Sequence, residues 1–241
     1  MRKLFLDKVD GDTITLSGDD HKHIAYSLRM RKGDEITVCA DGVDYTAIIR
    51  EMTKTSTIAE ITGKARSVSE PSIELTLFFG VLKGDKNDYV VQKCTELGVK
   101  EFVPFISDFC AVTSESVKIE RLSRIALEAA KQSGRGFVPT VSSPVKFNDL
   151  SDLLRGYDTV VFPYEQEDEL PIDDYLKKSA RGKTAVVIGS EGGFSRKEAD
   201  VLRKIAGGSV TLGERILRAD TACVAVVSVV MYAFGEWRRN K

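Results

Sequence analysis

From Pro71 onward the chain alternates short apolar runs with helix-like segments, and this alternation restricts the fold more than any other feature of the sequence. Helices are expected over residues 89–97, which end at Gly98, over 119–133, where apolar residues share one face, and over about 220–237. Strands are expected at LTLFFGVL, FVPFI, DTVVFPY, TAVVIG and SVTLG, which are residues 75–82, 102–106, 158–164, 184–189 and 209–213. This order predicts an α/β fold with a mostly parallel sheet and helices on both of its faces.

Residues 1–70 have a different pattern, in which strand-like segments alternate with turns rather than with helices. TITL, EITVCA and YTAIIRE are strand-like, and Asp10-Gly11-Asp12 and Asp41-Gly42 are turn signals. A short helix is expected from about His21 to Met30. We therefore expect a small β-barrel over residues 1–70 and a second domain over 71–241, with the boundary in the polar stretch 64–70.

The charge and the rare residues of the chain exclude several classes of protein. A net charge of −1 argues against binding to polyanions through an overall positive field, although residues 183–241 carry 10 basic and 6 acidic side chains. The N-terminus does not resemble a signal peptide, and the apolar stretch 222–234 is too short to cross a bilayer. The four cysteines lack metal-ligand spacing. His21 and His23 could line one side of a metal site, but no Cys or third His completes it, so both are expected to be surface or capping residues. We expect reduced thiols, no metal, no membrane partner and a cytoplasmic location.

The segment IGSEGGFSRKEAD, residues 188–200, forms a glycine-rich turn between an expected strand and an expected helix. Ser195 stands three residues before Glu198, which is the spacing of a capping box at a helix start. Gly192 and Gly193 permit tight backbone geometry. The sequence contains neither GxxxxGK[ST] nor GxGxxG, so a nucleoside triphosphatase and a dinucleotide-binding fold are not supported. On its own, the turn is more often structural than ligand-binding.

A second unusual loop, LGERILR at residues 212–218, follows the expected strand 209–213. Two irregular loops would then leave strands at the same edge of the sheet, where α/β folds bind ligands. Leu212, Ile216 and Leu217 are apolar residues in this loop, and they need either a core or a flat ligand to cover them. Arg218 precedes a helix start, where the helix dipole disfavours a cation, so an anion or a polarised carbonyl is the expected partner.

Together, IGSEGGFSRKEAD and LGERILRADTA resemble the signature of the small-subunit ribosomal RNA methyltransferase E family. These are SPOUT-class enzymes that methylate N3 of a uridine in 16S ribosomal RNA. Further blocks extend the resemblance over nearly the whole chain: KGDK at 83–86, QKCTELGV at 92–99, EAAKQSGR at 128–135, and His23, Leu28-Arg29 and Gly33-Asp34. Position 190 is Ser where Pro is commoner in the family, and Asp220 stands where Glu is frequent.

The resemblance implies an S-adenosylmethionine site built from a deep trefoil knot, together with an N-terminal PUA-like barrel that binds RNA. The loops after the strands DTVVFPY, TAVVIG and SVTLG would surround the cofactor. The glycines of GSEGGF would bring bare backbone against it, and Leu212 and Leu217 would enclose its adenine. The implied cofactor-binding residues are Phe162, Pro163, Ile188, Gly189, Glu191, Gly192, Gly193, Leu212, Gly213, Ile216 and Leu217. The family also implies a homodimer, which agrees with the apolar character of residues 223–234.

The expected reaction assigns roles to two residues near the glycine turn. Uridine N3 carries a proton at neutral pH, so we expect Arg218 to stabilise the anion that forms when this proton leaves. Glu191 is a candidate base, with the anchoring of its loop an equally good interpretation. The expected partner is 16S ribosomal RNA within the assembled 30S subunit. The candidate residues for contact with this RNA are Arg29, Arg31, Lys83, Gln132 and Arg135, and Lys32 is a weaker candidate. Gln132 and Arg135 are expected three residues apart on the polar face of the helix 119–133, where they could contact RNA or the cofactor. A solvated surface is the ordinary alternative for them and for the exposed arginines.

Two other functions compete with base methylation. A non-catalytic RNA-binding protein would keep the barrel but would not need two specific loops at one sheet edge. A ribose 2′-O-methyltransferase would share the knot but not the KGDK, ELGV and QSxR blocks.

Overall fold

A computed structural model describes residues 3–238 and divides the chain into two compact units. The first unit contains the described residues up to Glu70 together with Ala130–Val138, and the second contains Pro71–Ala129 and the residues from Pro139 onward. The assignment of the segment 130–138 to the first unit was not expected from the sequence. Its attachment there rests on Glu70, whose carboxylate pairs with the Arg135 guanidinium at 2.8 Å and accepts the backbone N–H of Gly136.

The first unit is built on a five-stranded sheet in the order β1-β3-β4-β5-β2. Its strands are β1 (Leu4–Phe5), β2 (Thr13–Ser17), β3 (Glu35–Ala40), β4 (Val43–Met52) and β5 (Ser56–Arg66). Alternate residues such as Ile14 and Leu16, or Ile36 and Val38, point into one core, as expected for a sheet with one covered face. Strand β5 was not expected, and it occupies part of the polar stretch that we predicted as a linker. The C-terminal half of β5 is exposed, so the residues of this half lack the alternation of apolar and polar side chains that identifies a strand.

The helix predicted over residues 21–30 begins and ends three residues earlier and is less regular than expected. The chain forms α1 (Gly18–Lys22) and continues as a π-helix, η1 (His23–Ser27). Arg29 then adopts a left-handed conformation with φ of 53°, which ends the helical segment.

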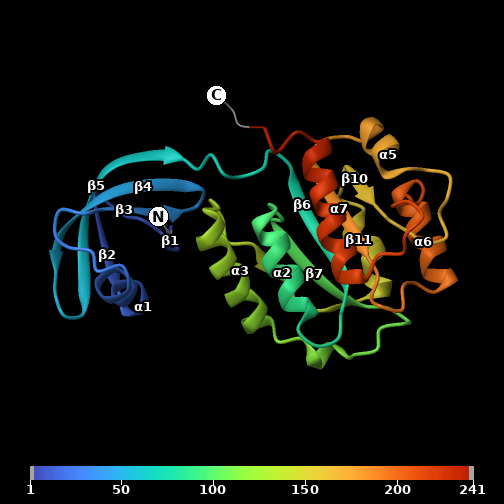
Figure 1. Ribbon diagram of the computed structural model, residues 1–241, viewed down its shortest axis with the longest axis horizontal. Coiled ribbons are helices and arrows are strands. Elements are labelled where there is room, and N and C mark those ends of the chain that lie inside the picture. The colour runs from blue at the N-terminus through green and yellow to red at the C-terminus, as the bar shows by residue number, and fades with distance from the viewer. Residues whose placement is uncertain (1–2, 239–241) are drawn as a thin grey trace. The chain divides into compact units, whose positions relative to one another are not determined.

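The second unit contains a parallel sheet in the order β10-β11-β6-β7-β8, and β9 also pairs with β7 (Figure 1). The strands are β6 (Glu74–Gly80), β7 (Glu101–Ile106), β8 (Thr140–Val141), β9 (Val145–Lys146), β10 (Thr159–Val161) and β11 (Lys183–Ile188). The helices are α2 (Lys86–Glu96), α3 (Ile119–Ser133), α4 (Leu150–Leu154), α5 (Ile172–Lys178), α6 (Arg196–Ala206) and α7 (Ala219–Ala233). The α/β class predicted from the sequence is confirmed for this unit.

Two apolar cores lie on the two faces of this sheet, because successive strand residues point in opposite directions. Leu77 and Phe79 of β6 and Val186 of β11 belong to the core under α2 and α7, whereas Phe78 and Val187 belong to the core under α4 and α6. Figure 1 shows α2 and α7 side by side over one face of the sheet. The helices therefore fix the strand ends from both sides.

The strand predicted at SVTLG is reduced to isolated bridges. Val210 pairs with Pro163, and Thr211 pairs with Pro171. Consecutive residues of this segment thus pair with two different segments, so no regular strand forms with either of them.

Candidate active site

Four neighbouring parallel strands of the second unit end at one edge of the sheet, and the loops that follow them form the candidate site. The loop after β11 contains Gly189–Ser195, and the loop after β6 contains Lys83-Gly84-Asp85. The turn after β7 is Ser107–Cys110, and β10 is followed by Phe162 and Pro163. Ligands bind at such carboxyl ends in open α/β sheets.

Glu191 joins the loop after β11 to the loop after β6. Its Oε1 accepts a hydrogen bond from the Lys86 ammonium at 2.8 Å and another from the backbone N–H of Lys83 at 3.2 Å. Burial raises the pKa of the Glu191 carboxyl, but the hydrogen bonds from Lys86 and from backbone N–H groups outweigh it and hold the pKa below its ordinary value. A carboxylate in this state is a weak proton acceptor, so its geometry favours the anchoring of the two loops.

The glycines of the turn are required by close packing within the protein. A Cβ on Gly192 would lie 2.7 Å from Cβ and 2.8 Å from the carbonyl oxygen of Phe109. A Cβ on Gly189 would lie 3.0 Å from the Phe194 ring, and Gly193 has a left-handed φ of 68°. The space that a Cβ on Gly192 would occupy is therefore filled by the Phe109 turn.

The capping box predicted at the start of the following helix is confirmed. The Ser195 hydroxyl accepts the Glu198 N–H, and the Glu198 carboxylate accepts the Ser195 N–H at 2.9 Å. Ser195 also donates to the Asp108 carboxylate at 2.7 Å, and the Asp108 N–H donates to Glu198 at 2.9 Å. The same residues thus cap α6 and attach the turn after β7.

Two of the predicted cofactor residues have side chains in the protein core. Phe162 is fully buried and packs its ring on Phe194 and Tyr164, and Ile188 is buried under α7. Their side chains fill the two cores because they alternate along strands that are covered on both faces. Any contact of Phe162 with a ligand would have to come from its backbone, and its carbonyl already accepts the N–H of Val210 at 2.9 Å.

The loop 212–218 combines half-buried apolar side chains with free backbone donors. Leu212 and Leu217 pack partly against the core under α7, whereas Ile216 is 85% exposed. Gly213 has a left-handed φ of 91°. Within residues 3–238, none of the backbone N–H groups of 214–218 donates a hydrogen bond. The loop therefore offers an apolar wall with backbone N–H groups beside it that no acceptor in residues 3–238 engages.

Arg218 is the residue that precedes α7, and its side chain is exposed. Asp220 lies in the first turn of the same helix, and its buried Oδ1 has no hydrogen-bond partner in the described part of the chain. A buried carboxylate oxygen without a donor is costly, so this position can accept a donor from a bound molecule.

The predicted RNA-contacting residues fall into two groups. Arg29, Arg31 and Gln132 belong to the first unit and are exposed, and Lys83 is exposed in the second unit. Arg135 is only 3% exposed and lies beyond the end of α3, so the prediction that it lies on the polar face of that helix is wrong. It is buried because its guanidinium pairs with Glu70.

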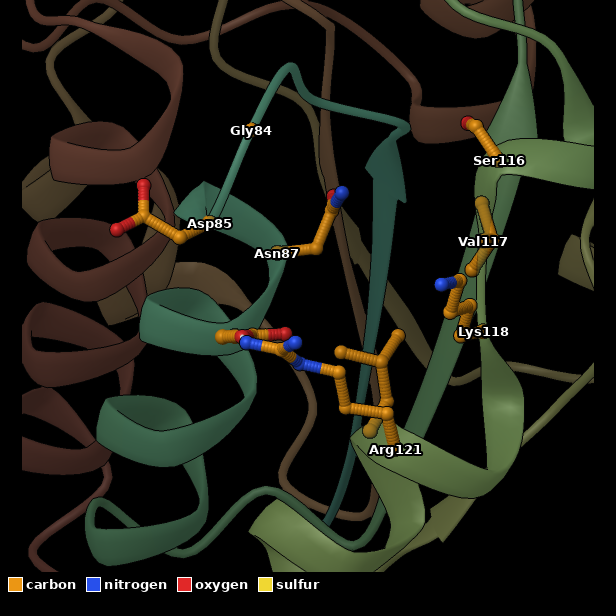
Figure 2. A pocket seen from close by; sticks show the side chains of 9 residues that line it. Gly84, Asp85, Asn87, Ser116, Val117, Lys118 and Arg121 are labelled. Carbon is orange, nitrogen blue, oxygen red and sulfur yellow. The ribbon is translucent and has the colours of Figure 1, made fainter.

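A cavity of about 330 Å³ adjoins the loop after β6 (Figure 2). Asp85 and Asp88 line it from one side, and Lys118 and Arg121 from the other. Arg121 reaches across to Asp88, with Nε at 2.9 Å from the carboxylate. Because its acidic and basic side chains balance, the cavity has no strong preference for an anion.

Sequence reasoning missed Lys86, Asp108 and Phe109, which hold the loops of the site together. The KGDK block was recognised, but only its first lysine was selected. The contacts of the turn 107–110 lie between residues more than eighty positions apart, and nothing local in the sequence signals them.

Residues 3–238 contain no group of three or more His, Cys, Asp or Glu side chains that could hold a metal ion. Among these residues there is also no helix long and apolar enough to span a membrane.

Comparison with known families identifies two matching domains. Residues 69–231 match the RNA methyltransferase domain, and residues 16–62 match the RNA methyltransferase PUA domain.

Individual relatives match over almost the full chain. Ribosomal RNA small subunit methyltransferase E of Bacillus subtilis is 30% identical, covering 92% of this chain and 91% of the relative. The protein of the same name from Aquifex aeolicus is 31% identical, covering 96% and 99%. The crystal structure of a ribosomal RNA small subunit methyltransferase E from Neisseria gonorrhoeae bound to S-adenosyl methionine superimposes with a TM-score of 0.84 at 27% identity, covering 99% of this chain and 100% of that chain.

Proposed function

The chain belongs to the ribosomal RNA small subunit methyltransferase E family, and from this premise we propose that it transfers a methyl group from S-adenosylmethionine to N3 of one uridine in 16S ribosomal RNA. The observation that carries the proposal is a sheet edge where the loop 189–195 follows β11 and where Val210, just before the loop 212–218, pairs with Pro163 after β10. In a relative from Neisseria gonorrhoeae, the same fold binds this cofactor. The first unit, which contains the PUA match, would bind the surrounding RNA.

The residues of the edge fit the chemistry of S-adenosylmethionine. Its adenine is flat and apolar on both faces, which suits the half-buried Leu212 and Leu217. Its polar groups need donors and acceptors, which the free N–H groups of 214–218 and the unpartnered Asp220 Oδ1 supply. Gly189, Glu191, Gly192, Gly193 and Gly213 would shape the neighbouring walls, with backbone contacts from Pro163.

The cofactor would supply an electrophilic methyl group on a sulfonium. This chain's residues would position the uracil N3 against that group while the N3 proton passes to solvent water. Arg218 would place its guanidinium against the uracil carbonyl oxygens and stabilise the negative charge that develops there. Glu191, whose pKa is lowered by Lys86, would hold the loops in place rather than take the proton. The target base must leave its stack to reach this edge.

We further propose that the chain forms a trefoil knot at this edge. Val210 exchanges hydrogen bonds with Phe162 and Tyr164, and Thr211 exchanges them with Leu170 and Ile172. The segment 209–211 therefore runs between two parts of the loop that follows β10, which is the arrangement that threading requires.

The protein would act as a homodimer in the cytoplasm, on RNA within the assembled 30S subunit. α7 is apolar nearly all round, and beyond its buried side it presents the half-buried Val224 and Val229 and the exposed Tyr232. An apolar surface of this kind suits a partner subunit.

The test is nucleoside mass spectrometry of small-subunit RNA after unmodified 30S particles are incubated with the protein and S-adenosylmethionine. The proposal predicts new 3-methyluridine. A ribose-methylated nucleoside would show that the protein is a ribose 2′-O-methyltransferase and not a base methyltransferase. RNA binding without any methylated nucleoside would show that the protein is a non-catalytic RNA-binding module. A parallel incubation with free 16S RNA tests the requirement for the assembled particle.

A further inference from the structure

Phe109 is an aromatic residue at the candidate site that none of the roles above uses. It lies in the turn Ser107–Cys110, which is closed by a hydrogen bond from the Cys110 N–H to the Ser107 carbonyl at 3.1 Å. This turn follows β7 at the carboxyl edge of the parallel sheet. Phe109 is thus beside the glycine turn, on the same edge as Glu191 and Lys86.

The backbone of Phe109 is held against the glycine turn. The Ser190 hydroxyl donates to the Phe109 carbonyl at 3.3 Å, and Gly192 leaves no room for a Cβ between the two segments. The preceding residue, Asp108, is bound through its N–H to Glu198 and through its carboxylate to Ser195. A side chain on such a constrained turn has a fixed direction, which reduces the entropy lost when it binds a partner.

The side chain of Phe109 nevertheless remains in solvent. It is 52% exposed, although the same unit contains a cluster of rings formed by the buried Phe105, Phe162 and Phe194 and the half-buried Phe147. Among the described residues Phe109 makes no ring contact with any of them. A rigid backbone that presents an apolar ring to water leaves burial energy unused in the free protein, and a flat ligand would recover it.

We propose that Phe109 is a positioning residue that stacks on an unpaired base of the substrate RNA at the active-site edge. The inference rests on the proposed function, since an RNA methyltransferase that acts on a base must hold that base outside its stack. The ring would replace part of the stacking that the RNA loses. Lys83, exposed on the neighbouring loop, supplies a positive charge for the adjoining phosphates.

The test compares the variants Phe109→Ala, Phe109→Leu and Phe109→Trp with the wild type. For each, KM and kcat are measured with unmodified 30S subunits, the Kd of S-adenosylmethionine by calorimetry, and Tm by thermal unfolding. We expect Phe109→Ala to raise KM for the 30S subunit by about 5- to 150-fold, the range of one lost base–aromatic stack. Phe109→Leu should match Phe109→Ala, whereas Phe109→Trp should restore the wild-type KM. The cofactor Kd and Tm should stay at the wild-type values in all three.

Two outcomes would overturn the inference. A wild-type KM for Phe109→Leu would mean that apolar bulk suffices, and an equal loss of cofactor affinity in Phe109→Ala would assign the ring a structural role in the loop. Filter binding of free 16S RNA separates this inference from the proposed reaction. If the wild type forms no 3-methyluridine, the proposed function fails, while weaker RNA binding by Phe109→Ala than by the wild type would still support the stacking role.

Discussion

At the scale of single residues, two carboxylates with lowered pKa values hold separate parts of the molecule together. Glu70 binds Arg135 and two backbone N–H groups of the first unit, and Glu191 binds Lys86 and the Lys83 N–H of the second. In both cases burial raises the pKa of the carboxyl and the hydrogen bonds outweigh it. Each ionised carboxylate therefore favours the folded state.

Replacing Glu70 with Gln should destabilise the first unit by about 3–5 kcal/mol, because it removes the carboxylate that pairs with the buried Arg135 guanidinium. The free energy of unfolding of the variant and of the wild type is measured by urea denaturation. The control is Glu60→Gln, which breaks the exposed pair with Arg50 and should cost less than about 1 kcal/mol. Because the Glu70 pKa is lowered in the folded state, its contribution is complete above the unfolded pKa and is lost as the pH falls through the folded value. Equal effects of the two variants would contradict the role given to Glu70.

Replacing Glu191 with Gln tests whether this residue anchors the loops or accepts the proton. An anchor should lose less than about tenfold in kcat, with the pH dependence of kcat unchanged, because the amide oxygen still accepts a hydrogen bond. The measurement is a pH–rate profile of both proteins. Disappearance of an acidic limb in the variant, together with a loss of about a hundredfold or more, would make Glu191 the base.

At the scale of elements, the glycine turn is shaped by its neighbours more than by a ligand. Gly192→Ala should lower Tm and weaken cofactor binding, since the new Cβ would lie 2.7 Å from Cβ of Phe109 and the turn would have to shift. Differential scanning fluorimetry and calorimetry give the two readouts. Gly156→Ala is the matched control, because its Cβ would meet only the Lys183 Nζ at 4.0 Å. If both variants keep the wild-type Tm, the close packing at Gly192 is not limiting.

The elements also show which features the sequence could predict. The capping box of Ser195 and Glu198 was predictable because its two residues are three positions apart and the interaction is local. The burial of Arg135 was not predictable, because its partner Glu70 is 65 positions away and a helical period places Arg135 on a polar face. For the same reason the turn containing Phe109 was missed, whereas the paired loops 189–195 and 212–218 were found through their unusual composition. The segment 209–211 has a strand's composition, but Val210 and Thr211 pair with two different segments, at Pro163 and Pro171, so neither ladder extends.

At the scale of the whole molecule, the proposed dimer depends on α7. Sedimentation equilibrium should give twice the chain mass of 26.6 kDa, because α7 carries apolar side chains beyond those buried in its own unit. Tyr232→Arg should shift the mass toward the monomer, since Tyr232 is 71% exposed at the end of this helix. Tyr89→Arg, an exposed tyrosine on α2, is the control and should leave the mass unchanged. A monomer in the wild type would exclude this interface.

The central claim is that methyl transfer takes place at the edge formed by the loops 189–195 and 212–218. The most direct test is single-turnover methylation of unmodified 30S subunits by the wild type and by Arg218→Ala, with cofactor affinity measured in parallel. Loss of the group that stabilises the uracil anion should reduce the rate by about a hundred- to a thousandfold, while the Kd of S-adenosylmethionine stays at the wild-type value. An Arg218→Ala protein that methylates at the wild-type rate would contradict the claim and place the reaction elsewhere on the protein.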